Sequence, residues 1–109
     1  MNEHLFNTLR ELAKDSTLSQ RDLSRKMGLS LGRVNYIVNA LLQKGYIKAE
    51  RFKNSKNKMA YMYVLTPKGV SEKITQTQAF LARRSIEYEM LKHEIEDLKV
   101  EDTYETKGK

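Results

Sequence analysis

Residues 30–43 carry side chains that could read the edges of nucleic-acid bases. Plotted as a helix at about 100° per residue, the apolar side chains fall on one arc of about 140°. The opposite side carries amide, guanidinium and phenol groups, and the segment contains no Asp or Glu. Arginine can bind the O6/N7 edge of guanine, and asparagine or glutamine can pair with adenine. The predicted contacts with double-stranded DNA are Ser30, Gly32, Arg33, Asn35, Tyr36 and Asn39.

The same pattern also fits an ordinary amphipathic helix with a solvated polar face. Two neighbouring features favour a DNA-reading helix instead. Gly28 suits the end of a short preceding helix, and Ser30 suits the cap of the next one. A helix, a short glycine-containing turn and a second helix form the arrangement that presents the second helix to the major groove.

Basic residues concentrate in a second segment, 48–58, where five Lys and Arg stand against Glu50 alone. Residues 46–53 and 59–65 are rich in β-formers, so we predict a β-hairpin whose tip is 54–58. Such a tip suits contacts with phosphates or the minor groove. The alternative interpretation is that the lysines only prevent the strands from pairing edge to edge with another sheet. The predicted DNA contacts of this wing are Arg51, Lys53, Asn54, Lys56, Asn57 and Lys58. We expect Tyr61 and Tyr63 to pack within the strands rather than to stack on bases.

The charge of the 109 residues is unevenly distributed, and its total is +6. Residues 1–69 hold thirteen Lys and Arg and five Asp and Glu, a net +8, whereas residues 70–109 hold seven and nine, a net −2. A uniform solubilising charge has no reason to concentrate in this way, so the asymmetry favours a polyanionic partner for the first part. The length allows one domain with one appended element and excludes a multi-domain enzyme.

The other reactive side chains form no catalytic or metal-binding constellation. The sequence has no Cys, and neither His4 nor His93 has a partner at metal-ligand spacing. We therefore expect no enzyme activity, no metal and no cofactor. No apolar run approaches the roughly 18 residues of a membrane helix, and the start lacks a signal-peptide pattern. We expect a cytoplasmic protein without a membrane partner.

The elements around these segments follow from capping residues and periodicity. We predict a first helix from Asn2 to about Lys14 and a short second helix from Ser19 to Met27. The third helix runs over 31–44, and the last begins at Thr66-Pro67 and ends at about Lys99. The predicted organisation is a DNA-binding domain over 1–66, a long helix over 67–102 and a flexible tail over 103–109.

The last helix carries an apolar seam at heptad spacing. A helix of this length cannot be covered by so small a domain, so the seam needs another chain, most simply a second copy. We expect its first two turns to pack onto the first helix through Val70 and Ile74. The predicted homodimer interface consists of Ile74, Leu81, Tyr88, Leu91, Ile95 and Leu98. The seam alone does not decide between parallel and antiparallel pairing.

Several motifs together resemble the winged helix-turn-helix of MarR-type bacterial regulators. Ser-Gln-Arg-Asp-Leu-Ser at 19–24, Ser-Leu-Gly-Arg-Val-Asn-Tyr at 30–36 and Asn-Ser-Lys-Asn-Lys at 54–58 are similar to the exopolysaccharide-associated MarR-family regulators. Leu-Thr-Pro-Lys-Gly at 65–69 matches the junction that those proteins have between the second wing strand and the last helix. The resemblance covers about residues 3–100.

This resemblance implies a dimeric transcriptional regulator of polysaccharide gene clusters, with DNA contacts at 30–36 and 54–58. Typical MarR proteins build their dimer from extended helices at both ends and often hold an effector there. This sequence begins almost directly at its first predicted helix, so the resemblance does not extend to an effector pocket, and no effector is assigned. The predicted fold class is α+β, mostly α: a winged helix-turn-helix with a two-stranded basic wing and a long C-terminal dimerisation helix. The alternative function is a winged-helix adaptor for protein assembly that binds no specific DNA.

Overall fold

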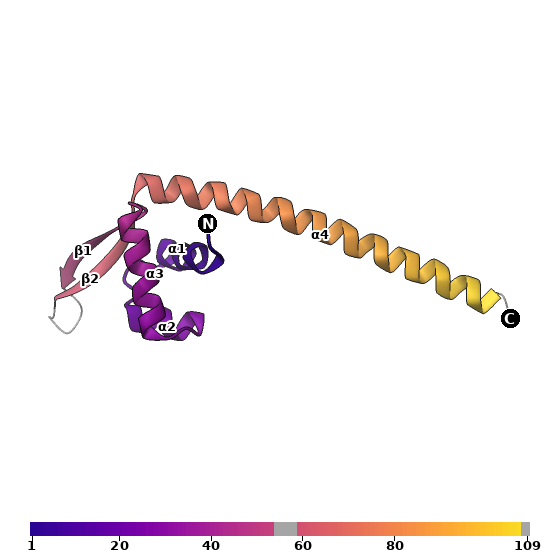
Figure 1. Ribbon diagram of the computed structural model, residues 1–109, viewed down its shortest axis with the longest axis horizontal. Coiled ribbons are helices and arrows are strands. Elements are labelled where there is room, and N and C mark those ends of the chain that lie inside the picture. Colours follow the sequence, from indigo (N-terminus) through magenta and orange to yellow (C-terminus); the bar gives the residue numbers. More distant parts are fainter. Residues whose placement is uncertain (54–58, 108–109) are drawn as a thin grey trace. The chain divides into compact units, whose positions relative to one another are not determined.

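The computed structural model describes residues 1–53 and 59–107 of the chain (Figure 1). It is mostly helical with one two-stranded sheet, which confirms the predicted fold class. The chain divides into two compact units, Met1–Gln76 and Thr77–Lys109. The elements in order are α1 (Glu3–Lys14), α2 (Gln20–Met27), α3 (Leu31–Gln43), β1 (Ile47–Lys53), β2 (Met59–Leu65) and α4 (Pro67–Lys107).

Each of the first three helices begins at the predicted capping residue. The Asn2 side chain accepts a hydrogen bond from the His4 N–H at 2.7 Å, and the Ser30 hydroxyl accepts one from the Arg33 N–H at 3.1 Å. Ser19 and Asp22 form a capping box in which each side chain accepts from the backbone N–H of the other, at 3.0 and 2.9 Å. The hydrogen bonds with Ser19 hold the pKa of the Asp22 carboxyl below its ordinary value.

The turn between α2 and α3 is closed by Gly28 and Ser24. Gly28 has a φ of 65°, in the left-handed region that glycine adopts without steric cost. The Ser24 hydroxyl donates to the Leu29 carbonyl, and the Leu29 N–H donates back to the Ser24 carbonyl at 3.1 Å. The two helices are thus held in a defined turn, which fixes where α3 begins.

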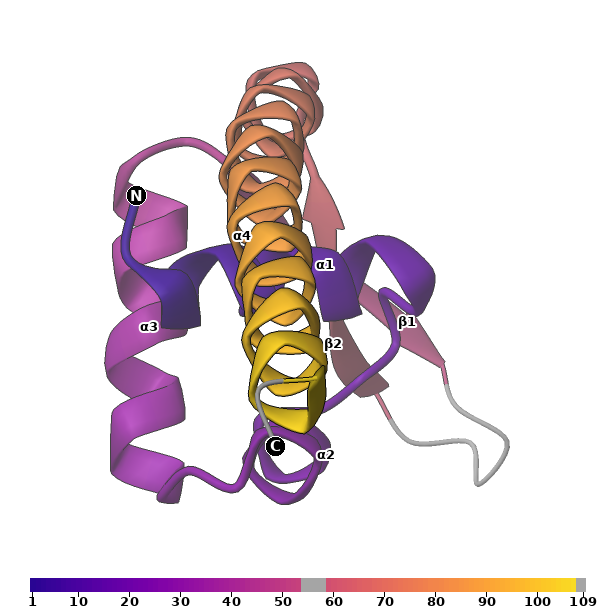
Figure 2. The same ribbon diagram turned by 90° about the vertical axis from the view of Figure 1, so that its right-hand side faces the viewer.

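The core of the first unit lies between α1, α2, α3 and the base of the hairpin. In Figure 2, α1 extends across the view from α3 toward the strands, and it contacts both α3 and β2. One side of α3 supplies nearly half of the buried apolar residues, so burial of that side sets how the helix is rotated. The core cluster consists of Leu9, Leu12, Leu18, Leu23, Val34, Ile37, Val38, Leu41 and Ile47.

The hairpin is antiparallel, with a register that runs from Ile47 opposite Leu65 to Lys53 opposite Met59. The Tyr63 N–H donates to the Ser16 carbonyl at 3.1 Å, so the segment before α2 lies along the outer edge of β2. The predicted tip contacts fall outside the described residues. They are Asn54, Lys56, Asn57 and Lys58.

Helix α4 begins in close contact with the segment that precedes β1. The Thr66 hydroxyl donates to the Gly45 carbonyl and accepts from the Gly69 N–H at 3.0 Å. A Cβ on Gly69 would lie 1.9 Å from the Tyr46 carbonyl oxygen. This glycine therefore permits a close backbone approach, and the first ten residues of α4, Pro67–Gln76, belong to the first unit.

Two expectations for α4 differ from the structure. Val70 and Ile74 are 46% and 54% exposed, so the predicted burial of the first two turns against α1 is wrong. The approach of Gly69 to Tyr46 directs this start of α4 against the segment before β1 instead. The helix also continues to Lys107 through the predicted tail, because no Gly or Pro interrupts residues 70–107.

The two helical glycines provide a matched pair for testing this approach. Gly69→Ala should lower the free energy of unfolding by about 1–3 kcal/mol, because the new methyl group would overlap backbone that cannot move aside. Gly32→Ala should be neutral or stabilising by up to about 1 kcal/mol, because nothing lies within 4 Å of its Cβ. Urea denaturation measures both. A Gly69→Ala protein as stable as wild type would contradict the close approach.

Candidate nucleic-acid interface

The polar side of α3 faces away from the core, as the helical pattern predicts. Val34, Ile37, Val38 and Leu41 are at most 3% exposed, whereas Tyr36 on the opposite side is 70% exposed. Ser30 is also exposed, with its hydroxyl engaged in capping the helix. The remaining exposed polar-side residues of α3 are Gly32, Arg33, Asn35, Asn39 and Gln43. Together they form an exposed polar surface, which we call the outer face of α3.

This surface is free of carboxylates, and neither its Arg33 nor Arg21 of the neighbouring α2 forms an ion pair with a described carboxylate. No Asp or Glu occurs between Leu23 and Ala49. Within residues 1–53 and 59–107, no carboxylate lies within 4.0 Å of a side-chain nitrogen of Arg21 or Arg33. Three other cations of the unit do have carboxylate partners: Arg25 pairs with Asp22 at 2.8 Å, Lys26 with Glu11 at 3.6 Å and Lys48 with Glu50 at 3.0 Å. The guanidinium groups of Arg21 and Arg33 are therefore available to bind an external anion.

A chain of side-chain hydrogen bonds joins α3 to α2 and to the hairpin. The Asn39 Nδ2 donates to the Asn35 Oδ1 at 3.2 Å, and the Asn35 Nδ2 donates to the Gln20 Oε1 at 3.2 Å. The Gln20 Nε2 donates in turn to the Tyr63 hydroxyl at 3.2 Å. We refer to Asn39, Asn35, Gln20 and Tyr63 as the amide relay.

The amide relay fixes the orientation of Asn35 on the outer face of α3. Once these two hydrogen bonds are made, the Asn35 amide still has one N–H and one carbonyl lone pair that the relay does not use. A donor and an acceptor side by side are what the N7 and N6 atoms of adenine require. Gln20 and Tyr63 were not among the predicted site residues, because no local pattern joins positions 20, 35 and 63 before the chain folds.

The described part of the wing carries an exposed pair of an arginine and a tyrosine. The Arg51 guanidinium lies 5.7 Å from the Tyr61 ring centroid and donates to the Tyr61 hydroxyl at 3.4 Å. The expectation that Tyr61 packs within the sheet is wrong, since it is 52% exposed. Tyr63 does pack against the core. The two side chains share one face of β2, but the core covers only the base of the hairpin.

Arg51 and Lys53 are both exposed, as a DNA-facing wing requires. They lie on the same face of the hairpin as Tyr63, because side chains two apart in a strand point the same way. Tyr63 belongs to the amide relay, so side-chain hydrogen bonds connect this face of the wing to the outer face of α3.

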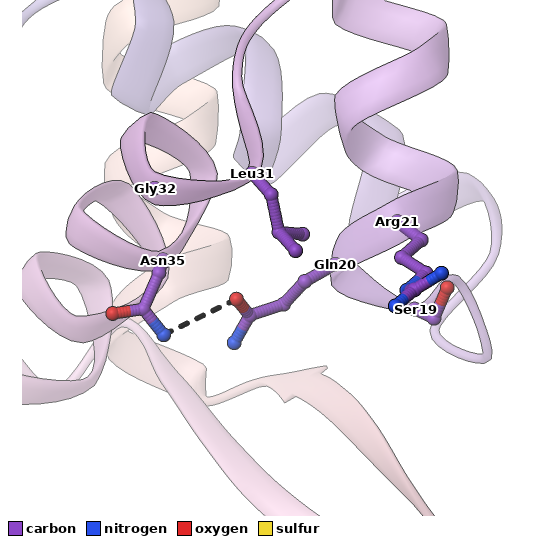
Figure 3. Close-up of a pocket in the computed structure, with 6 residues that line it drawn as sticks. All are labelled: Ser19, Gln20, Arg21, Leu31, Gly32 and Asn35. Carbon is purple, nitrogen blue, oxygen red and sulfur yellow. Dashed lines mark hydrogen bonds between the residues drawn. The ribbon is translucent and has the colours of Figure 1, made fainter.

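An open hollow of about 580 Å³ lies where the N-terminal ends of α2 and α3 meet. Figure 3 shows the Leu31 side chain extending toward Gln20, beside the hydrogen bond from Asn35 to Gln20. The lining residues are Ser19, Gln20, Arg21, Leu31, Gly32 and Asn35. The helical pattern placed Leu31 on the apolar arc, but it is 45% exposed because it occupies the first turn, beyond the reach of the core.

In residues 1–53 and 59–107, no group of three or more His, Cys, Asp and Glu side chains is arranged to hold a metal ion. No helix in the same ranges is long and apolar enough to cross a membrane.

The helix-turn-helix and its hairpin make the first unit a winged helix-turn-helix. A family model described as "Winged helix-turn-helix DNA-binding" matches residues 1–48. No curated protein sequence matches the chain significantly.

Solved structures with this fold are similar to most of the chain. A MarR/EmrR family transcriptional regulator from Acinetobacter sp. ADP1 is 25% identical with a TM-score of 0.61, over 78% of this chain and 58% of that one. A mutant of MepR from S. aureus is 20% identical with a TM-score of 0.71, over 94% and 76%. FabT from Streptococcus pneumoniae, in complex with DNA, is 22% identical with a TM-score of 0.60, over 78% and 58%. The chain thus spans only 58% of the length of the first and third of these proteins.

A double-mutant cycle on stability tests the amide relay. Gln20→Ala and Tyr63→Phe should each destabilise slightly, and their effects should be non-additive by roughly 0.5 kcal/mol, because both remove the same hydrogen bond. Tyr61→Phe is the matched control, since the Tyr61 hydroxyl bonds Arg51. Its effect should add to that of Gln20→Ala. If the effects of both tyrosine substitutions simply add to that of Gln20→Ala, the Gln20–Tyr63 bond of the relay does not form in solution.

Proposed function

We propose that this chain is a sequence-specific, double-stranded DNA-binding transcriptional regulator of the MarR type that acts as a homodimer. The observation that carries the proposal is the exposed, carboxylate-free outer face of α3. In this proposal α3 lies in the major groove, where its Arg33 and Asn35 side chains reach base edges.

The electrostatics of the first unit support a phosphate-rich partner. Arg21 and Arg33 lack internal carboxylate partners among the described residues, and residues 1–69 carry a net +8. Each cation that neutralises a phosphate releases counterions, so affinity should fall steeply with salt. The FabT structure that shares this fold is a complex with DNA, as is a structure of S. aureus MepR. These complexes support the same partner for this chain.

The wing contributes contacts to the DNA backbone or the minor groove in this proposal. Arg51 and Lys53 are exposed on the face of the hairpin that the amide relay connects to α3. The sequence of the predicted tip, residues 54–58, adds further basic residues to the wing. Backbone contacts position a protein on the duplex without reading its sequence.

Two substitutions separate base reading from backbone binding. A duplex selected from a random pool and a random duplex are compared by fluorescence anisotropy over a salt series. Arg33→Ala should reduce the affinity ratio between the two duplexes by about 5- to 150-fold. Lys53→Ala should weaken both duplexes similarly and reduce the salt slope by about one. If Arg33→Ala weakens both duplexes equally, α3 does not read the bases.

The second unit supports homodimerisation through α4. Five seam residues after Thr77 are more than half exposed in the single chain. Burying them against a second copy would remove most of an apolar seam from water, interrupted by Arg84 between Leu81 and Tyr88. These five are Leu81, Tyr88, Leu91, Ile95 and Leu98.

Charges beside the seam favour a parallel pair. Glu87 and Glu94 directly precede the seam residues Tyr88 and Ile95, and Lys92 and Lys99 directly follow Leu91 and Leu98. In a parallel coiled coil, Glu87 of one copy faces Lys92 of the other, and Glu94 faces Lys99. An antiparallel pair would instead set glutamates against glutamates and lysines against lysines. A parallel pair also places both N-terminal units at the same end, as two adjacent DNA half-sites require.

The absence of cysteine from the sequence allows a direct test of this orientation. Leu98→Cys should form an intermolecular disulfide under mild oxidation, because a parallel seam brings the two copies of position 98 within disulfide reach. Val100→Cys is the control, since position 100 lies outside the seam and should not cross-link efficiently. Non-reducing electrophoresis measures both. A chain that sediments as a dimer but does not cross-link at position 98 would contradict parallel pairing.

Control of polysaccharide gene clusters is the finer part of the proposal. It is supported by the sequence resemblance at 19–24, 30–36 and 54–58. Mapping the genomic fragments bound by the protein tests it.

The exposed seam of α4 favours one other function, a winged-helix adaptor for protein assembly. A titration with random duplex at moderate salt separates the two functions. The absence of binding at micromolar protein would favour the adaptor.

A further inference from the structure

The hollow between α2 and α3 combines an apolar floor with polar walls. Leu31 is 45% exposed there, whereas the four apolar residues that follow it on the inner side of α3 are almost fully buried. A half-exposed leucine adds little to folding stability, since much of its apolar surface stays in water. Its surface remains available for contact with an external apolar group.

Gly32, also in the lining, is not required by the packing of the chain. Nothing lies within 4 Å of the position that a Cβ would take, and its φ is not in the left-handed region. Glycine is nevertheless among the poorest helix formers, so alanine would suit this position of the helix better. Gly69, in contrast, is needed because a Cβ would overlap Tyr46. The absence of a side chain at position 32 is thus not explained by packing, and it leaves the backbone of α3 open to something that approaches from outside.

The charge and polarity of the residues that line the hollow indicate the kind of partner that binds there. Arg21 has no carboxylate partner within residues 1–53 and 59–107, and none of the lining residues is acidic. On another wall, the relay bond to Gln20 orients the Asn35 amide. A cationic rim, a fixed amide and a small apolar floor match the major-groove edge of an A·T pair, which presents the N7 and N6 of adenine and the methyl group of thymine.

We propose that this hollow is a thymine-reading subsite, in which Leu31 contacts the 5-methyl group of a thymine and the bare backbone at Gly32 admits the base edge. This proposal rests on the proposed function, since it assumes that α3 lies in the major groove. It assigns to Leu31 a part in sequence preference through an apolar contact, beside the polar contacts of Arg33 and Asn35.

The test removes one methyl group at a time from the DNA. In a duplex selected from a random pool, each thymine is replaced singly by deoxyuridine, which lacks only the 5-methyl group. The wild-type protein should lose about 3- to 5-fold in affinity at one thymine of each half-site, the effect of burying about one methyl group. Leu31→Ala should bind the thymine and deoxyuridine duplexes equally at that position. Because Leu31 is half-exposed, this variant keeps the folded core.

Two further variants serve as controls. Leu31→Met keeps an apolar contact and should retain most of the preference for thymine. Gly32→Ala should fold at least as stably as wild type yet bind the selected duplex at least 5-fold more weakly, since its methyl group occupies the space for the base.

The outcomes distinguish this proposal from the proposed function. If the wild type is indifferent to every substitution by deoxyuridine, or Leu31→Ala keeps the wild-type preference, the subsite is refuted while DNA binding stands. If the wild type enriches no sequence from the pool, both proposals fail.

Discussion

Burial of one side of α3 is the constraint on which the rest of the structure depends. Val34, Ile37, Val38 and Leu41 are enclosed by α1, α2 and the base of the hairpin. Successive residues of a helix are turned by about 100°, so a shift of one residue would bring Arg33 into the core and turn Val34 outward. Desolvating an unpaired guanidinium is far more costly than exposing a valine. The same burial that stabilises the fold therefore also determines which side chains face outward.

The amide relay extends this control from the backbone to individual side chains. The core fixes the rotation of α3, but an exposed asparagine could still adopt several rotamers. Bonds to Gln20 and Asn39 restrict Asn35, and the bond from Gln20 to Tyr63 ties the orientation to the hairpin. A reading surface that is ordered before binding loses less conformational entropy when it meets its partner.

Much of the fold could be predicted because its signals are local. The caps at Asn2, Ser19 and Ser30 and the glycine at 28 each act on the nearest backbone, so the sequence reveals them directly. The outward side of α3 was predictable for the same reason, since it depends on periodicity within one helix.

The features that escaped prediction depend on residues far apart in the chain. The contact of Gly69 with Tyr46 and the bond of Gln20 with Tyr63 appear only when the first unit has assembled. The exposure of Tyr61 depends on where the core ends rather than on the alternation of the strand. The exposure of Leu31 has the same cause, since periodicity gives the direction of a side chain but not the extent of the core.

The central claim is that the outer face of α3 is the surface that meets DNA. Its most direct test is a titration of the isotope-labelled chain with a selected duplex, followed by backbone amide NMR shifts. We expect little change along the outer side of α1 and the largest changes at Gly32, Arg33, Asn35, Tyr36 and Asn39. Changes confined to α1 or to α4, with the amides of α3 unaffected, would contradict it.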